Sequence, residues 1–249
     1  MSKSIPQIFN EFNDLNVLII GDVMLDSYIW GTVERVSPEA PVPVVSVRKR
    51  DVRLGGAANV ALNVQSLGAK PILCALIGAD DAGRKLLQNL KKKGIAYDGI
   101  VVSTTRPTTV KTRVIASHQH VVRVDEESDA MPTAMEEKRL LKKIEKLLPN
   151  CQVVVFEDYD KGSINPAIIE EVVALANKLE IPTVVDPKKR NFLFYKDVTL
   201  FKPNLKELRE GLKIDVNALN QKELASAVEA LKVKLNAKGA LVTLSEQGA

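Results

Sequence analysis

Short apolar runs alternate with amphipathic segments along most of the chain. The candidate strands are rich in Val, Ile and Leu and are bounded by polar residues. They cover Asn16–Ile20, Pro71–Ile77, Gln152–Phe156, Thr183–Val185, Val198–Phe201 and Ala240–Leu244. Continuous apolar runs of this length are typical of parallel strands that are buried on both faces.

The helices between these runs have recognisable ends. Asp80 or Asp81 precedes a helix that ends at Gly94. Thr133 and Glu136 have the spacing of a capping box. The other predicted helices begin at Asn165-Pro166 or cover Leu205–Gly211 and Gln221–Asn236. Regular alternation of strands and helices predicts right-handed crossovers, and therefore an α/β fold with a doubly wound, mostly parallel sheet and helices on both faces.

Two stretches break this alternation. Ser27–Lys49 is strand-like but contains three prolines, and Thr108–Asp125 alternates apolar with polar residues. Both patterns indicate an antiparallel accessory sheet, with the prolines at edges or bends. We therefore expect one α/β domain over residues 1–249 whose main sheet is covered by a small lid, formed by about 27–49 and 108–125.

Composition narrows the class of protein. Hydrophobic residues make up 45% of the chain, charged residues 27% and aromatic residues 4%, which indicates a globular domain with an aliphatic core. The net charge of +4 is the difference between 35 basic and 31 acidic residues, so no nucleic-acid partner is indicated. No apolar run approaches the ~20 residues of a membrane span, and Met1–Asn13 lacks the apolar stretch of a signal peptide. We expect a cytoplasmic protein with no membrane partner, in which Cys74 and Cys151 are reduced core thiols.

Polar residues follow each predicted strand. Because parallel strands end at the same edge of a sheet, these residues are expected to gather on one rim. They include Asp22, Asp80, Glu157, Asp158, Asp186, Lys188, Lys202, Asn204, Ser245 and Glu246. One or two of the acids are explained equally well as helix caps. The full set of carboxylates, lysines and an amide favours a site for hydroxyls, a metal ion and phosphate.

Two short motifs lie near this rim. Gly55-Gly56 precedes a predicted helix that carries Asn59, and paired glycines let backbone N–H groups approach a ligand closely. A plain tight turn is the alternative, and neither a dinucleotide fingerprint nor a P-loop is present. Asp22 and Asp26 follow the first strand, where they either contact a ligand or cap a solvent-exposed turn.

The second lid segment carries charged residues. Lys111 and Arg113 alternate onto one face, which is either a solvated face or a grip for an anion such as a sugar phosphate. His118 and His120 also share a face. Two histidines without a third ligand nearby are a poor zinc site, so we favour polar contacts of the lid.

Together these residues resemble the ribokinase-like, or PfkB, family of carbohydrate kinases. Gly55-Gly56 with Asn59 matches the first signature of the family, and Asn204-Leu205-Lys206-Glu207 matches its N-x-x-E element. Within the family, the chain looks most like the D-glycero-β-D-manno-heptose 7-phosphate kinases, which supply ADP-heptose for lipopolysaccharide. Four segments carry this closer resemblance, namely 21–26, 37–44, 111–116 and 241–248.

The resemblance implies transfer of a phosphoryl group from Mg·ATP to the anomeric hydroxyl of a heptose 7-phosphate, and a homodimer formed through the lid. The substrate-binding residues that it implies are Asp22, Asp26, Gly55, Gly56, Asn59, Lys111, Arg113 and Asp158. Those implied for the cofactors ATP and Mg²⁺ are Lys161, Asp186, Lys188, Asn204, Leu205, Lys206, Glu207 and Ser245, with Glu207 at the metal ion.

The chain departs from the family in one respect. The second signature, G-A-G-D, which supplies the anion hole and the catalytic aspartate, does not occur in residues 1–249. We therefore expect a domain without its C-terminal part, with exposed apolar surface near Ala249, no catalytic base and little or no kinase activity in an ATP-consumption assay. Two alternatives stay open, namely another PfkB kinase for a sugar or nucleoside and a non-catalytic domain that binds a sugar phosphate.

Overall fold

A parallel six-stranded sheet forms the centre of the computed structural model, which describes residues 3–117 and 119–249. The strand order is β12-β11-β10-β9-β1-β4, and every neighbouring pair runs parallel. The strands are β1 (Asn16–Gly21), β4 (Lys70–Cys74), β9 (Val153–Glu157), β10 (Thr183–Asp186), β11 (Leu200–Phe201) and β12 (Gly239–Ala240). The predicted α/β class with a mostly parallel sheet is confirmed.

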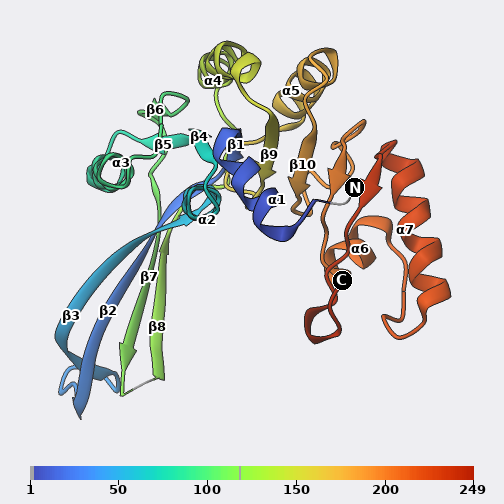
Figure 1. The fold of residues 1–249 in the computed structure, drawn as a ribbon. Coiled ribbons are helices and arrows are strands. Elements are labelled where there is room, and N and C mark those ends of the chain that lie inside the picture. Colours follow the sequence, from blue (N-terminus) through green and yellow to red (C-terminus); the bar gives the residue numbers. More distant parts are fainter. Residues whose placement is uncertain (1–2, 118) are drawn as a thin grey trace.

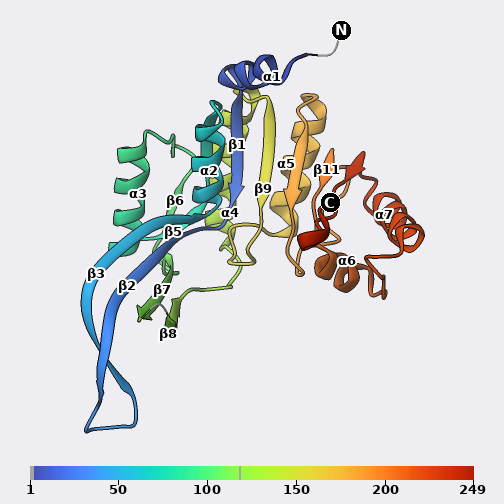
Figure 2. The same ribbon diagram turned by 60° about the horizontal axis from the view of Figure 1, so that its bottom comes forward.

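Helices cover both faces of this sheet (Figure 1). They are α2 (Ala57–Ser66), α3 (Asp81–Lys93), α4 (Ala134–Leu147), α5 (Pro166–Lys178), α6 (Leu205–Leu212) and α7 (Gln221–Leu235). The short α1 (Ile5–Glu11) lies instead beyond the end of the sheet where β1 begins (Figure 2), and 3₁₀ turns occur at Phe12–Asp14, Leu148–Asn150 and Ser245–Gln247. Successive residues of a strand point to opposite faces, so Leu18 and Ile20 of β1 join the core beneath α4 and α5. Val17 and Ile19 join a second core, beneath α2 and α3.

The predicted helix starts agree with the structure because caps are local. Asp80 caps α3, accepting a hydrogen bond from Gly83 N at 2.7 Å. Thr133 and Glu136 form the capping box of α4, and Asn165 caps α5 with Pro166 in its first turn. The seven-residue α1 was not predicted, and its residues are all exposed. Cys74 and Cys151 are buried and free, as expected of core thiols.

Several predicted strands are shorter than the apolar runs suggested. The run Pro71–Ile77 contains two strands, because β4 follows β1 only as far as Cys74 and the chain then leaves the main sheet. Its second part, β5 (Leu76–Gly78), pairs with β6 (Val101–Ser103) in a separate two-stranded sheet. Val198–Phe201 and Ala240–Leu244 likewise reduce to the short β11 and β12. Apolar runs continue past the point where a strand loses its hydrogen-bonding neighbour.

The lid is a four-stranded sheet that projects from the main domain (Figures 1 and 2). Its order is β3-β2-β7-β8, and its strands are β2 (Val23–Val36), β3 (Pro43–Gly56), β7 (Thr109–Ala116) and β8 (Gln119–Glu126). The prediction of a wholly antiparallel sheet was wrong, since β2 and β7 pair in parallel. Both strands leave the main domain in the same direction, which makes their pairing parallel.

The structure also bears on membrane association. Among the helices formed by the described residues, none is both long and apolar enough to cross a bilayer.

Candidate active site

Acidic and basic side chains gather where β9, β10 and β11 end. Asp186 and Glu157 are registered partners on β10 and β9. The Nζ atom of Lys202 lies 2.7 Å from Asp186, and that of Lys188 lies 2.6 Å from Glu207. The ring of Tyr159 lies beneath Lys188, 5.7 Å from its ammonium group. We call these six residues the rim cluster: Glu157, Tyr159, Asp186, Lys188, Lys202 and Glu207.

The N-x-x-E element forms the start of α6. Asn204 Oδ1 accepts a hydrogen bond from Glu207 N, and Glu207 Oε2 accepts one from Asn204 N, each at 2.9 Å. This capping box aims the remaining oxygen of Glu207 at Lys188. Leu205 and Lys206 follow in the first turn, and the side chain of Lys206 is 83% exposed. Glu207 of the motif and Lys188 thus lie together at the N-terminus of α6.

Glu157 belongs to this cluster; it was predicted to lie on the rim, but the resemblance assigned it no role in binding substrate or cofactor. Burial, together with the neighbouring Asp186, raises the pKa of Glu157 from 4.5 to about 7. Burial also raises the pKa of Tyr159 to about 12. The signal in the sequence was position alone, because Glu157 directly precedes Asp158 at the end of a predicted strand.

Asp22 is buried and satisfied by the protein itself. The residue is only 2% exposed, and its two carboxylate oxygens accept hydrogen bonds from the backbone N–H groups of Tyr159, Lys161 and Ser163. Its carbonyl accepts from Ala57 N at 2.9 Å. The predicted contact of Asp22 with a sugar hydroxyl stays a prediction, and its present partners are all within the chain.

Asp158 lies in a similar environment. Its carboxylate accepts hydrogen bonds from Asn191 Nδ2 at 2.9 Å, from the Tyr195 hydroxyl at 2.8 Å and from Asp160 N at 2.8 Å. Burial raises the pKa of Asp158. In the described part of the chain, the Oδ1 atom of Asn191 is a buried side-chain oxygen without a hydrogen-bond partner. Asp158 therefore joins Asn191, Tyr195 and the backbone of Asp160 on the buried side of the strand ends.

The paired glycines bring the lid and α2 together. Gly55 and Gly56 pair with Met24 and Val23, and Gly56 has a φ of +57°. A Cβ on Gly56 would collide with the carbonyl oxygen of Asp22, and one on Gly55 with the carboxylate of Asp26. This close approach explains why glycine is needed at both positions.

A cleft of about 550 Å³ opens beside the paired glycines. It is lined by Asp26 and Tyr28 of β2, by part of β3, by Asn59 and Leu62 of α2, and by the end of α3. The residues contributed by β3 and α3 are Asp51, Val52, Arg53, Leu54, Asn89 and Lys93. Asp26 and Asn59, predicted from separate motifs, therefore line one cleft.

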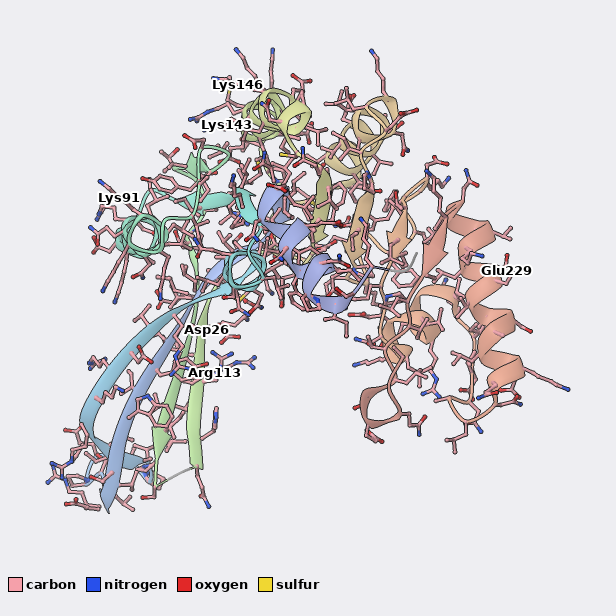
Figure 3. All side chains as sticks on the ribbon, viewed as in Figure 1. Asp26, Lys91, Arg113, Lys143, Lys146 and Glu229 are labelled. Carbon is pink, nitrogen blue, oxygen red and sulfur yellow. The ribbon has the colours of Figure 1, made fainter. Side chains whose placement is uncertain are left out.

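One face of the lid is densely charged. Arg113 lies 2.5 Å from Asp26, and Lys111 lies 3.2 Å from Asp125 and 2.8 Å from Glu127. Figure 3 shows Asp26 and Arg113 near the root of the lid. Both predicted anion-binding cations are thus paired with carboxylates in the structure. Lys161, on the loop after β9, shares Glu127 with Lys111 at 2.7 Å.

Other predicted residues lie elsewhere. Asp80 is used as the α3 cap and also accepts from Thr108 N at 2.8 Å, because β5 belongs to the separate two-stranded sheet. Ser245 begins an exposed turn, in which hydrogen bonds from the backbone N–H of Glu246 and from Ser245 lower the pKa of Glu246. His120 is exposed on β8, and His118 lies outside the described residues.

The donor set suits a nucleotide with a hard cation. In residues 3–117 and 119–249, no three histidine, cysteine or acidic side chains converge closely enough to hold a metal ion by themselves. Mg²⁺ is usually held by one or two carboxylates together with substrate phosphates, so it does not require such a group. Glu207 and Asp186 are the carboxylates here that could hold such a cation, and Lys188 and Lys202 are the cations that could pair with phosphate oxygens.

Comparison with known sequences gives a consistent result. The family model described as pfkB family carbohydrate kinase matches residues 14–249. The bifunctional protein HldE of Pelobacter propionicus is 40% identical over 246 residues, covering 99% of this chain and 50% of the relative. HldE of Helicobacter pylori is 41% identical over 234 residues, covering 93% of this chain and 50% of the relative. The chain spans about half the length of these curated relatives.

Solved structures share the fold. Phosphofructokinase-2 from Escherichia coli in complex with fructose-6-phosphate matches with a TM-score of 0.73 and 17% identity, covering 94% of this chain and 75% of the other. Its tetrameric inhibited form matches with a TM-score of 0.71 and 18% identity, covering 94% and 75%. At this level of identity the likeness concerns the fold alone.

Proposed function

Because this chain belongs to the pfkB family of carbohydrate kinases, we propose that it acts on D-glycero-β-D-manno-heptose 7-phosphate, with ATP as phosphoryl donor and the anomeric hydroxyl as acceptor. The observation that carries the proposal is the cleft at the root of the lid, where Asp26 and Asn59 meet Arg53 and Lys93. Asp26 and Asn59 offer a hydrogen-bond acceptor and an amide to sugar hydroxyls. Arg53 and Lys93 offer two positive charges to a phosphate.

The sugar end of the site is built around the paired glycines. Asp26 and the amide of Asn59 are the groups that would orient hydroxyls, while the backbone at Gly55 and Gly56 allows a close approach. Arg113 bonds to Asp26 and holds that carboxylate in place. Phosphoryl transfer depends mostly on positioning and charge, and this arrangement supplies both for the acceptor.

The nucleotide end is the rim cluster. Glu207 and Asp186 would hold Mg²⁺ through their carboxylate oxygens, and Lys188 and Lys202 would pair with phosphate oxygens. When bound, the cation neutralises the charge that develops on the transferred group. Lys188 bonds to Glu207 in the structure, so a bound phosphate would take over the lysine and leave the carboxylate to the cation.

Two features support a heptose phosphate over a free sugar. The chain resembles heptose 7-phosphate kinases in four segments, three of which contribute residues to the lid. The charged lid face and the cleft also offer the cationic groups Arg53, Lys93, Lys111 and Arg113. Arg53, Lys111 and Arg113 are paired with carboxylates in the structure, and a bound phosphate would share them.

We propose further that two copies of the chain associate through the other lid face. Val122 and Val124 of β8 lie opposite Val114 and Thr112, which alternate with the charged Lys111 and Arg113. Val122 is 48% exposed and Val124 is 49% exposed. An exposed apolar face on a projecting sheet favours burial against a second copy.

Titration calorimetry tests the substrate assignment. We expect heptose 7-phosphate to bind the chain more tightly than the free heptose and fructose 6-phosphate, and we expect Asp26→Ala to weaken the binding at least tenfold. ATP consumption in the presence of Mg²⁺ with the same sugars is the second readout, and here we expect little or no turnover, because residues 1–249 do not contain the G-A-G-D signature with its catalytic aspartate. Equal affinity for the free heptose and its phosphate would contradict the proposal.

A further inference from the structure

The loop Tyr159–Ser163, which follows β9, is held from two sides by opposite charges. On one side, Asp22 Oδ2 accepts N–H bonds from Tyr159 at 2.9 Å and Lys161 at 3.0 Å, and Asp22 Oδ1 accepts one from Ser163 at 2.8 Å. All three bonds come from the main chain. The carboxylate therefore determines the path of the loop whatever side chains the loop carries.

Arg106 binds the same loop from the other side. Its guanidinium donates to the carbonyl oxygens of Lys161 and Gly162, the latter at 2.9 Å. A third bond reaches the carbonyl oxygen of Ser128 at 3.2 Å. Burial lowers the pKa of Arg106, while Asp22 and Glu136 oppose that shift. Arginine suits this position because its planar fork carries five donors at fixed angles.

The third bond of Arg106 reaches the segment by which the lid returns to the main domain. We call residues 127–130 the return segment. Glu127 bonds to Lys161 Nζ at 2.7 Å. Arg190 bonds to the carbonyl oxygen of Asp129 at 2.8 Å and to the carboxylate of Asp160 at 2.9 Å.

The return segment also packs closely on the loop. Gly162 lies against Ala130, where a Cβ on the glycine would collide with the alanine carbonyl oxygen. Four separate contacts thus join the return segment to the loop after β9. Arg106 is the only side chain named among them that bonds to the backbone of both.

We infer that Arg106, acting with Asp22, is a positioning residue that couples the lid to the rim cluster. The loop carries Tyr159, whose ring supports Lys188, and Lys161, which shares Glu127 with Lys111 of the lid. Holding the loop therefore fixes the sugar side and the phosphate side of the site relative to one another. The effect on substrate binding rests on the proposed function, whereas the coupling of the two segments does not.

Hydrogen exchange measured by mass spectrometry tests the coupling directly. In Arg106→Met we expect amides of the return segment and of residues 159–163 to exchange at least tenfold faster than in the parent, while those of α7 are unchanged. Arg106→Lys keeps the charge but cannot reach three carbonyl oxygens, so we expect exchange between that of the parent and that of the methionine variant. Arg84→Met, on the exposed face of α3, is the matched control and should exchange as the parent does.

Three exchange results would overturn the inference. They are parental exchange in Arg106→Met, equally faster exchange throughout that variant, and full parental behaviour in Arg106→Lys. Equally faster exchange throughout Arg106→Met would mean that Arg106 stabilises the whole fold. Parental exchange in Arg106→Lys would mean that the positive charge alone, and not the three hydrogen bonds, holds the two segments.

Titration with heptose 7-phosphate is the second readout. We expect Arg106→Met to bind the sugar phosphate at least tenfold more weakly than both the parent and Arg84→Met, at a temperature where all three are folded. Equal affinity of parent and Arg106→Met would overturn the positioning role. If the parent itself does not bind, the proposed substrate is wrong, and the exchange experiment still decides whether Arg106 couples the two segments.

Discussion

Burial separates residues that look alike in the sequence. Asp22 and Asp26 lie four positions apart on the same motif, yet Asp22 is 2% exposed and bonds to main-chain N–H groups, while Asp26 lines the cleft. Glu157 and Asp158 are adjacent, and only Glu157 joins the rim cluster. Asp158 lies just past the end of β9 and accepts hydrogen bonds from Asn191 and Tyr195, so adjacency in the sequence does not imply a shared role.

Glu157 leads to a prediction about pH. Its pKa is about 7 in the folded chain and 4.5 when it is exposed, so the folded state retains its proton over that window while the unfolded state releases it. The contribution of Glu157 to the free energy of unfolding is therefore fully present below about pH 4.5 and declines as the pH rises to 7. We expect the free energy of unfolding of the parent, measured with urea, to fall relative to that of Glu157→Gln by up to roughly 3 kcal/mol between pH 5 and 8. A parallel pH dependence of the two proteins would contradict this.

At the scale of secondary structure, two similar capping boxes occupy different places. Thr133 and Glu136 begin α4 away from the rim cluster, whereas Asn204 and Glu207 begin α6 within it. A capping box requires only residues three apart, and the sequence analysis predicted the one at Thr133 and Glu136. Asn204 and Glu207 were identified there only as the N-x-x-E element of the family. The sequence did not show that Glu207 also meets Lys188, which lies on a different segment.

This pair of boxes offers a matched experiment. We expect Asn204→Ala and Thr133→Ala each to lower the free energy of unfolding by about 1 kcal/mol, since each removes one helix cap. Only Asn204→Ala should also weaken binding of Mg·ATP, because it releases the residue that orients Glu207. Urea unfolding and nucleotide titration measure the two effects. Equal nucleotide affinity in the two variants would remove Asn204 from the site.

At the scale of the whole molecule, the chain divides into a helix-covered sheet and a projecting lid with two unlike faces. The charged face carries Asp26, Lys111 and Arg113, on the side that we propose binds the sugar. The apolar face carries Val122 and Val124. A sheet that is exposed on both faces has few core contacts of its own, so a partner for the apolar face would add stability that the projecting strands lack.

The proposed association through the lid is tested by sedimentation. We expect the parent to sediment as a dimer and the double variant Val122→Asp, Val124→Asp to sediment as a monomer, because two buried carboxylates without partners oppose association. Val233→Asp on α7, where the valine is 74% exposed, is the control and should remain dimeric. A monomeric parent, or dissociation of the control as well, would contradict the proposal.

The sequence by itself determined the features that depend on near neighbours. The alternation of strands and helices and the caps at Asp80, Thr133 and Asn165 all follow from residues a few positions apart. The resemblance carried by short motifs also indicated the family.

Only the tertiary structure decided how the polar residues are used. The three hydrogen bonds that the Asp22 carboxylate accepts join residues 137, 139 and 141 positions apart in the sequence. Lys188 and Glu207, which form an ion pair, are 19 positions apart. The parallel pairing of β2 with β7, the split of the run Pro71–Ile77, and the joint use of the loop Tyr159–Ser163 by Asp22 and Arg106 are non-local in the same way. Local pattern reports which face of an element is apolar, whereas hydrogen-bond partners and burial are set by segments that meet only when the chain has folded.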